Sequence, residues 1–337
     1  MEPNAGQPAG LGIHESAVEL DSLIADTPLS PLPFYTMDSK HYSRRRFATL
    51  SAAASASLAI DSIAQNSNET MKLKKSLKHG MIKSASSIEE KFSLAKEAGF
   101  DGIEFDGPIP DGEIPQIIAA SKDSGLVVPG LVAGTAGRML ALDDASERKE
   151  GIERFSQALH DAKALGGNTV LLYPGIVNED YPYDVVYKRL QESVAELIPV
   201  SAETGVKIAF ENVWNNIFVS PLEARDFVDS FQSDQVGWYF DVGNVVRFGW
   251  PEQWIRILGK RILKLDIKEY SRELQNNEGL WKGFSAKLGE GSVNWAEVMK
   301  ALQEVDYRGE WGSAEVAGGD IDRLKDVSRR MDLVFAQ

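Results

Sequence analysis

From Lys72 onward, short hydrophobic runs alternate with longer segments in which hydrophobic residues recur at helical spacing. The short runs are continuous rather than alternating, which is typical of strands buried on both faces of a parallel sheet. Eight strands are predicted, over residues 77–82, 102–105, 127–131, 169–173, 207–211, 236–241, 262–267 and 310–316. Eight helices are predicted between and after them, over residues 88–98, 113–124, 145–165, 185–204, 221–231, 251–258, 295–305 and 321–335.

Residues at the ends of the predicted helices support these boundaries. Several helices stop at a glycine shortly before the next strand, as at Gly99, Gly125 and Gly205, and glycine readily takes the left-handed conformation that ends a helix. Ser87 precedes the first helix and can cap its free N–H groups. Eight alternating units favour a single closed (β/α)8 barrel over an open sheet. No Gly-x-Gly-x-x-Gly follows the first strand, so the main signature of a dinucleotide-binding fold is missing.

The first seventy residues depart from this pattern. Three consecutive arginines end at Arg46 and precede Phe47, a weakly hydrophobic run over residues 49–60, and small residues at Ser62 and Ala64. This order resembles a twin-arginine export signal with its cleavage site, and the run is too short to span a membrane. A basic tail ahead of an alanine-rich helix is the alternative. We expect residues 1–70 to be a disordered leader, with a conventional start at Met37, and residues 71–337 to form the barrel domain.

Composition excludes several classes of function. The chain has 337 residues, of which 43% are hydrophobic, and a formal net charge of −14, which disfavours nucleic acid and anionic membrane surfaces as partners. It has no cysteine, so disulfides, thiolate metal sites and a cysteine nucleophile are excluded. Two of its four histidines, His14 and His41, fall in the expected leader. A metal site in the barrel would therefore be built mainly from carboxylates.

Acidic residues stand at the carboxyl ends of several predicted strands, where barrels of this type place their active sites. They are Glu104, Glu211, Asp241, Asp266 and Glu315. Ionised groups at buried strand ends are costly unless they are paired or bound to a cation. A single such acid more often pairs with a lysine, but Glu211, Asp241 and Glu315 together predict a site for a hard divalent ion, Mg²⁺ or Mn²⁺ ahead of Zn²⁺. For Glu104 a substrate contact and a structural ion pair stay open.

Short motifs surround these acids: AFEN at residues 209–212, FDVGN at 240–244, IKE at 267–269, KLGEG at 287–291 and AEV at 314–316. In this order and spacing they resemble the xylose-isomerase-like TIM-barrel family of sugar and sugar-phosphate isomerases and epimerases. The nearest members are L-xylulose-5-phosphate 3-epimerases, ketose 3-epimerases and hydroxypyruvate isomerase. The resemblance extends from about residue 72 to the C-terminus.

The resemblance implies a role for each acid. Glu211 and Glu315 would bind the metal and face opposite sides of a ketose or ketose phosphate, so that one removes a proton beside the carbonyl and the other returns it. Asp241 would be a ligand only, and the metal would stabilise the enediolate. The family has a histidine as its fourth ligand where this sequence has Asp266. Asp266 can still bind Mn²⁺ or Mg²⁺, although it adds a negative charge that Lys268 could neutralise.

Residues near these strand ends are candidates for binding a small carbohydrate substrate. Trp214 could offer an apolar face to the sugar, and Asn244 and Lys268 could bond to its hydroxyls. Arg272 stands where some family members have a substrate-binding arginine. Trp214 and Arg272 could equally pack within their loops. The sequence leaves open whether the chain forms a homo-oligomer.

The export signal favours an alternative function and location. We expect a periplasmic or otherwise exported protein, or a cytoplasmic one if the leader is not functional. An exported enzyme would rarely meet sugar phosphates, so a metal-dependent lyase or dehydratase acting on a keto-sugar or keto-glycoside stays open. A non-catalytic carbohydrate-binding barrel is a further alternative. A barrel endonuclease for abasic DNA is disfavoured by the scarcity of histidine and by the net charge of −14.

Overall fold

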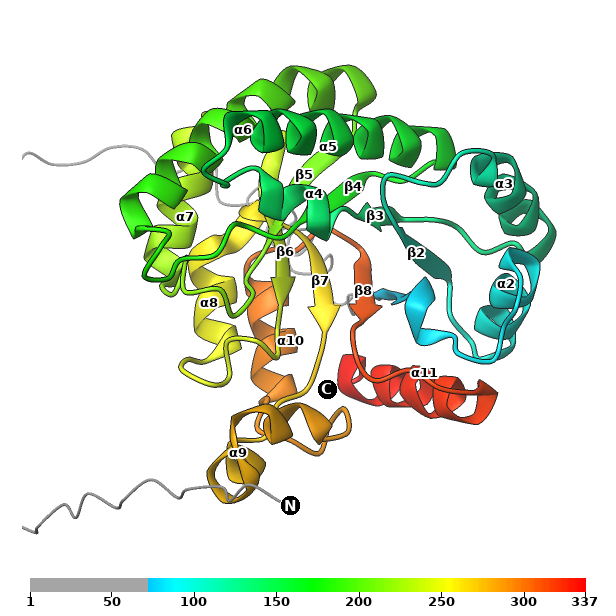
Figure 1. Cartoon of the computed structure of the whole chain (residues 1–337). Coiled ribbons are helices and arrows are strands. Elements are labelled where there is room, and N and C mark those ends of the chain that lie inside the picture. The colour runs from blue at the N-terminus through cyan, green and yellow to red at the C-terminus, as the bar shows by residue number, and fades with distance from the viewer. Residues whose placement is uncertain (1–71) are drawn as a thin grey trace, which may run out of the picture. The chain divides into compact units, whose positions relative to one another are not determined.

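The computed structural model describes residues 72–337 of the chain. These residues form a closed barrel of parallel strands. The strands pair in chain order and the last pairs with the first. Figure 1 shows these strands and the helices around them. The strands are β1 Lys74–Lys78, β2 Gly102–Asp106, β3 Gly130–Val132, β4 Thr169–Leu172, β5 Lys207–Glu211, β6 Val236–Asp241, β7 Ile262–Ile267 and β8 Trp311–Ala314. The predicted (β/α)8 barrel is thereby confirmed, while the predicted leader lies outside the described residues.

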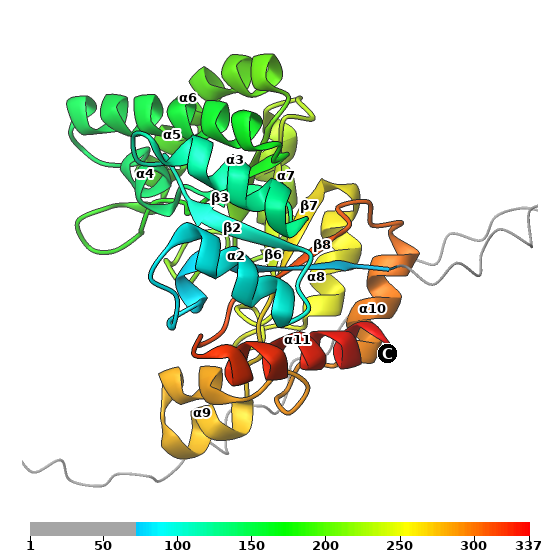
Figure 2. The ribbon, with the colours of Figure 1, turned by 90° about the vertical axis from the view of Figure 1, so that its right-hand side faces the viewer.

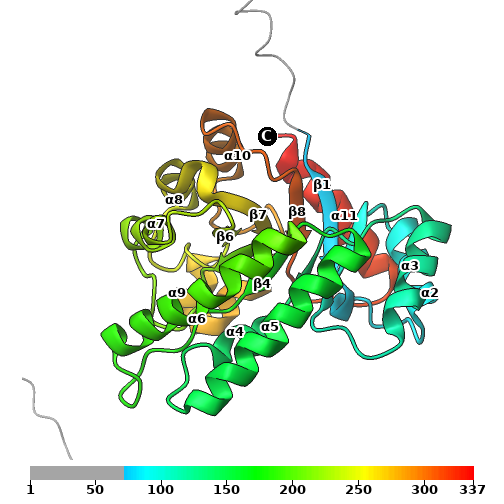
Figure 3. The same ribbon diagram turned by 90° about the horizontal axis from the view of Figure 1, so that it is seen from above.

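The helices surround the strands when the barrel is seen from above (Figure 3). The longer ones are α2 Ile88–Glu97, α3 Glu113–Ser124, α5 Ala145–Leu165, α6 Tyr183–Thr204, α7 Pro221–Ser230, α8 Pro251–Leu258, α10 Trp295–Glu304 and α11 Ile321–Phe335. Shorter elements are α4 Gly134–Met139, α9 Arg272–Glu278 and the 3₁₀ turns η1 His79–Met81, η2 Gly259–Arg261 and η3 Leu280–Ser285. None of the helices within residues 72–337 has the length and apolar character needed to cross a membrane.

The predicted bounds of two strands, β1 and β3, are wrong by three residues or more. β1 ends at Lys78 rather than at Ile82, because His79–Met81 turn away as the 3₁₀ helix η1. β3 begins at Gly130, since Val127 makes only an isolated bridge to Gly102. The sequence pattern also missed α4 and α9, which are short helices within the loops after β3 and β7.

The strands bury two different kinds of side chain because alternate residues point to opposite faces. Phe210, Trp238 and Phe240 are fully buried in the large hydrophobic core, which also includes residues of the surrounding helices. A separate small cluster contains Val132, Leu171, Ala209 and Tyr239. Ionisable residues are buried as well, and these inward positions carry the site described below.

An irregularity between β6 and β7 sets the level of two site residues. Trp238 pairs with Ile262, but the next residue, Tyr239, pairs with Lys264, so that β7 holds one extra residue. Such a bulge re-aims the side chains that follow it. As a result Asp241 pairs directly with Asp266 at the carboxyl end of the barrel. Beyond this end, α9 projects away from β7 (Figures 1 and 2).

Candidate functional site

Four carboxylates meet at the carboxyl end of the barrel. Glu211 and Asp241 end β5 and β6, Asp266 is the penultimate residue of β7, and Glu315 follows β8. One carboxylate oxygen of each lies within 4.8 Å of those of the others. Glu211, Asp241 and Asp266 are buried, whereas the side chain of Glu315 is 28% exposed. The structure therefore brings together all four residues that the sequence nominates as metal ligands.

Two asparagines orient Glu211 and Asp241. Asn212 joins β5 to β6, because its Nδ2 donates to the backbone oxygen of Asp241 and its Oδ1 accepts from the Asp241 N–H, both at 2.8 Å. The backbone N–H of Asn244 donates to Asp241 Oδ1 at 2.7 Å. The Asn244 side chain donates to Glu211 Oε1 at 3.2 Å. One oxygen of each carboxylate is thus held by Asn244 in the loop after β6, while Asn212 fixes the backbone of Asp241.

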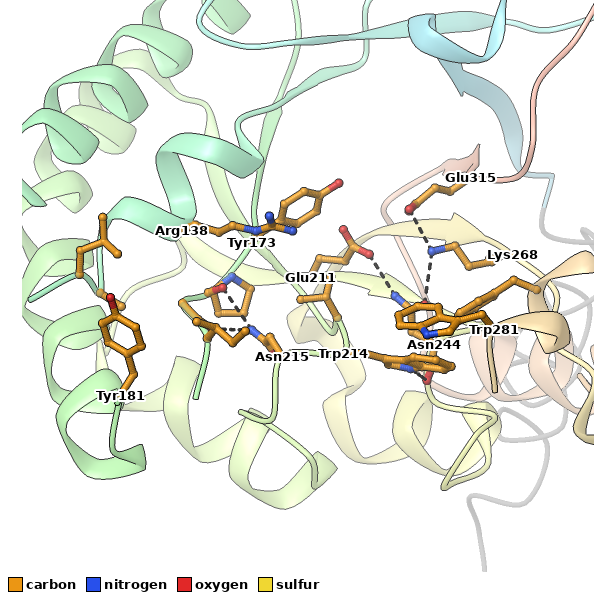
Figure 4. Close-up of a pocket in the computed structure, with 17 residues that line it drawn as sticks. Arg138, Tyr173, Tyr181, Glu211, Trp214, Asn215, Asn244, Lys268, Trp281 and Glu315 are labelled. Atoms are coloured by element: carbon orange, nitrogen blue, oxygen red, sulfur yellow. Dashed lines mark hydrogen bonds and ion pairs between the residues drawn. The ribbon is translucent and has the colours of Figure 1, made fainter. Parts of the chain in front are cut away.

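Two lysines balance part of the negative charge. Lys268 Nζ lies 2.9 Å from both Asp241 Oδ2 and Glu315 Oε1. Lys78 Nζ lies 3.0 Å from Asp266 Oδ1. When all of them are ionised, four carboxylates and two ammonium groups leave two negative charges. Figure 4 shows Lys268 beside Glu315, with Glu211 reaching into the same space.

Burial and neighbouring charges move the pKa values of these acids in different directions. Burial, reinforced by Glu315, raises the pKa of Glu211 well above its usual value. Burial also raises the pKa of Asp266 well above its usual value, and that of Asp241 to about 6 even though Lys268 opposes the change. For Glu315 burial acts in the same direction, but the positive charges of Lys268 and Lys78 and the hydrogen bonds to its carboxylate together outweigh it, so its pKa is lowered. The two glutamates thus differ in their tendency to hold a proton.

Several carboxylate oxygens of this cluster are buried without a hydrogen-bond partner among the described residues. They include Glu211 Oε2, Asp266 Oδ2 and Glu315 Oε2. An unsatisfied buried polar atom is costly, and a cation placed among these oxygens would remove that cost. Oxygen donors suit Mg²⁺ or Mn²⁺, and a divalent cation would balance the two remaining charges. The residues present therefore fit a divalent metal.

The cluster opens into a cavity of about 570 Å³. Trp214, Trp281 and Phe284 form one end of its wall, and Arg138, Tyr173 and Tyr181 form the other, as Figure 4 shows for those it labels. In this view Glu211 lies between these ends, whereas Lys268 and Glu315 lie on the side of Trp214 and Trp281. The volume falls within the range of roughly 300–1,000 Å³ that is common for small-molecule sites.

Three of the predicted substrate-binding residues, Trp214, Asn244 and Lys268, line this cavity. Their contact with a substrate stays a prediction. Arg272 packs within its loops instead, since its guanidinium donates to the backbone oxygens of Val246 (2.9 Å) and Gly249 (2.7 Å). It also lies 5.1 Å from the ring centre of Trp250.

Glu104 belongs to a buried ion network and does not line the cavity. Its carboxylate accepts from Lys78 (2.8 Å), Lys264 (3.0 Å), the Tyr239 hydroxyl (2.7 Å) and the Ser313 hydroxyl (2.8 Å). Although burial opposes this, Lys264 and Lys78 hold the pKa of Glu104 far below its usual range. Of the two alternatives left by the sequence, the structure places Glu104 in the structural ion pair.

Sequence reasoning missed several residues of the site. Lys78 lies inside a run predicted as continuous strand, and its charge in a buried strand was the available signal. Tyr173 directly follows β4, at an end where the wall of a barrel site is expected. Arg138, Trp281 and Phe284 lie on short helices in the loops, where no regular spacing marks them.

Residues 92–332 match the family described as the xylose isomerase-like TIM barrel, and the chain belongs to this family. A putative L-ribulose-5-phosphate 3-epimerase of Escherichia coli (strain K12) is 24% identical over 241 residues, which cover 65% of this chain and 80% of that protein. A 3-dehydro-D-guloside 4-epimerase of the same organism is 30% identical over 154 residues, 42% of this chain and 58% of the relative. An uncharacterized protein of Methanocaldococcus jannaschii is 24% identical over 48% of this chain, and the match spans only 55% of that protein.

Solved structures show the same fold. A 3-keto-D-glucoside 4-epimerase from E. coli, in its apo form, superposes with a TM-score of 0.67 at 18% identity, covering 79% of this chain and 100% of that one. An L-ribulose 3-epimerase superposes with a TM-score of 0.66 at 20% identity, covering 79% of this chain and 95% of the other. At such identities the likeness establishes the barrel and its topology.

Proposed function

We propose that the protein is a divalent-metal-dependent sugar isomerase or epimerase that moves a proton on a carbon beside a carbonyl group. The observation that carries the proposal is the pair Glu211 and Glu315, which reach one cavity from β5 and β8 within a four-carboxylate cluster. Relatives whose names describe sugar epimerases support it. Ketoses, ketose phosphates and keto-glycosides are all candidate substrates.

Each glutamate has one anchored oxygen and one without a partner among the described residues. Glu211 Oε1 accepts from Asn244 and Glu315 Oε1 accepts from Lys268, while Oε2 of each is unsatisfied. One glutamate removes the proton from the carbon, and the C–H electron pair moves toward the carbonyl, whose oxygen takes the negative charge of an enediolate. The other returns a proton, either to the opposite face for epimerisation or to the adjacent carbon for isomerisation.

The remaining cluster residues position these groups. A divalent cation, Mn²⁺ or Mg²⁺, held by Glu211, Asp241, Asp266 and Glu315 would supply a Lewis acid for the oxygens of the substrate. Lys268 keeps Glu315 and Asp241 in place, and its ammonium group adds positive charge beside the reacting oxygens.

A metal-dependent lyase is the second candidate, and the extension of the cavity beyond the carboxylates favours it. Such a reaction begins with the same proton removal. The electron pair then forms a carbon–carbon double bond, while the bond to an oxygen substituent on the next carbon breaks. The protonated glutamate gives its proton to that leaving oxygen, so the products are an unsaturated keto-sugar and water or an alcohol.

Proton exchange in heavy water tests the proposal. Ketoses, ketose phosphates and keto-glycosides are incubated with the full chain and Mn²⁺ or Mg²⁺, and NMR records deuterium incorporation together with the product formed. We expect Glu211→Gln and Glu315→Gln to lower the exchange rate by about 10²–10⁴-fold, the usual contribution of a general acid or base. The matched control is Glu192→Gln, which changes an exposed glutamate on α6. Exchange at the parent rate in both active-site variants would contradict the two-glutamate mechanism, and loss of water or alcohol would identify the lyase.

A further inference from the structure

An aromatic shelf, made of Trp214, Trp281 and Phe284, forms one end of the cavity. The ring centre of Trp214 lies 5.0 Å from that of Trp281 and 4.8 Å from that of Phe284. Trp281 is 70% exposed, although an indole ring is among the largest apolar surfaces that a side chain can offer. Exposed apolar surface of this kind, beside a cavity, is typical of a ligand-binding site.

The shelf is held from behind by Tyr270, which is fully buried. The Tyr270 ring packs edge-on against Trp214, with centres 5.5 Å apart, and lies 4.8 Å from the ring centre of Phe284. Its hydroxyl donates to the backbone oxygen of Leu280 at 2.9 Å. Gly283 lies so close to the Tyr270 ring that a Cβ there would have no room. The rings are therefore positioned before any ligand arrives, which reduces the entropy lost on binding.

The shelf begins beside the proposed reaction centre. Lys268 Nζ, which pairs with Glu315 at 2.9 Å, lies 5.3 Å from the ring centre of Phe284. The indole N–H of Trp214 donates to the backbone oxygen of Asn244, whose side chain holds Glu211. A sugar ring at the carboxylates would therefore have its substituent, and not its reacting carbon, over the shelf.

The charges along the cavity favour a neutral group at the shelf. Lys268 and Arg138 are the cations that line the cavity within residues 72–337. Lys268 is held by Asp241 and Glu315, and Arg138 lies at the opposite end, 5.3 Å from the ring centre of Tyr173. Arg247, which does not line the cavity, lies 4.9 Å from the ring centre of Trp214, so a phosphate beside the shelf would meet Arg247 rather than a cluster of cations lining the cavity.

We infer that the shelf is a subsite for a second ring, joined to the reacting sugar through its anomeric carbon, and that the substrate is a keto-glycoside. This inference rests on the proposed function. Because a glycosidic bond fixes the anomeric carbon as an acetal, the carbonyl must lie on another carbon of the ring. A reaction that oxidises a ring hydroxyl must therefore supply the substrate.

The test compares substrates that differ only in the group at the anomeric carbon: a methyl, a phenyl and a glucosyl derivative of the same keto-glucoside. We expect Trp281→Ala to lower kcat/KM for the phenyl and glucosyl substrates by roughly fivefold to tenfold, mainly through KM, as expected for the loss of one stacking contact. The methyl substrate should lose much less. Trp281→Phe should recover most of the difference, and the phenyl and glucosyl arms show whether the second ring is an aromatic group or a sugar.

Trp250→Ala is the matched control, because Trp250 is 52% exposed and does not line the cavity. It should leave the ratio between the substrates unchanged. An equal loss for all three substrates in Trp281→Ala, or no loss, would overturn the inference. A preference for ketose phosphates that disappears in Arg138→Gln would also overturn it.

Equilibrium binding separates this inference from the proposed function, because it requires no reaction. Titration of the full chain with unoxidised phenyl and methyl glucosides, followed by calorimetry, should show tighter binding of the phenyl compound that is lost in Trp281→Ala. If that difference appears while no sugar exchanges protons, the shelf stands and the proposed chemistry fails. If free ketoses exchange protons but the phenyl group adds no affinity, the shelf alone is wrong.

Discussion

Buried acids lie at two places inside the barrel and differ in how completely their charges are paired. Glu104 is surrounded by two lysines and two hydroxyl donors, and its pKa is far below the usual range. The four carboxylates of Glu211, Asp241, Asp266 and Glu315 share two lysines, and burial raises the pKa of three of them. Lys78 belongs to both groups, since it contacts Glu104 and Asp266.

Glu104 is an acid that stabilises the fold, whereas the four clustered carboxylates need a cation to balance their charge. Removal of a fully paired buried carboxylate strongly destabilises a protein, because the partners of the carboxylate are left unpaired. A cluster with more acids than partners destabilises the folded chain unless a cation or protons join it. Expected effects of mutation, metal and pH follow from this contrast.

The largest expected difference lies between Glu104→Gln and Glu211→Gln. Glu104→Gln leaves Lys264, which is fully buried, without its counter-charge, and should lower the free energy of unfolding by about 3 kcal/mol. Glu211→Gln removes surplus negative charge and keeps an acceptor for Asn244, so the metal-stripped protein should lose little stability. Urea unfolding measures both. The contrast fails if Glu211→Gln is the more destabilising change.

A metal bound by the four clustered carboxylates should stabilise the folded chain. With free Mn²⁺ at a hundred times its dissociation constant, the free energy of unfolding should rise by about 2.7 kcal/mol, because the cation binds the folded chain alone. Thermal unfolding with Mn²⁺ and with a chelator measures this rise. Asp241→Asn should abolish most of it, and the exposed change Glu192→Gln should not. An equal rise in the parent and in Asp241→Asn would exclude this cluster as the binding site.

A smaller effect is expected when the fourth acid is exchanged. Asp266→His replaces a hard oxygen donor with a nitrogen, and should change the ratio of Zn²⁺ to Mg²⁺ affinity by about tenfold in favour of Zn²⁺. Asp266→Asn is the matched control, since it keeps the size and an oxygen but removes the charge. Calorimetric titration gives the affinities. Unchanged metal content and affinity in Asp266→His would show that Asp266 is not a ligand.

In the metal-stripped protein, the two groups of acids should change the free energy of unfolding in opposite directions as the pH rises. Burial raises the pKa of Asp241 from 3.8 to about 6, so its contribution to stability is present below 3.8 and is lost as the pH rises through 6. The pKa of Glu104 is lowered from 4.5, so its contribution is present above 4.5 and is lost as the pH falls. Unfolding measured across this pH range should show a smaller decline above pH 4 in Asp241→Asn. In Glu104→Gln the loss of stability at low pH should be smaller than in the parent. Identical pH profiles of stability in the two variants would contradict the different roles of Asp241 and Glu104.

The sequence predicts the strands and the acids at their ends because both depend on local pattern. The runs that end at Glu211 and Asp241 are mostly apolar and unbroken, and their predicted boundaries match the structure. The contact of Lys78 with Asp266 joins residues far apart in the chain, and the extra residue in β7 is visible only once β6 and β7 are paired. The sequence does not predict the shelf, because Trp281 and Phe284 form it only through their packing against Trp214 and Tyr270.

The segment formed by α9 and η3 has a consequence for how such an enzyme can diversify. Trp281 and Phe284 both belong to this one segment between β7 and α10, whereas the carboxylates stand at the ends of the barrel strands. If the shelf binds the second ring of the substrate as we infer, changes in this segment alter which compounds are accepted while the reactive centre is left intact. On that inference, substrate preference would be carried by one contiguous piece of chain that can be exchanged without touching the strands.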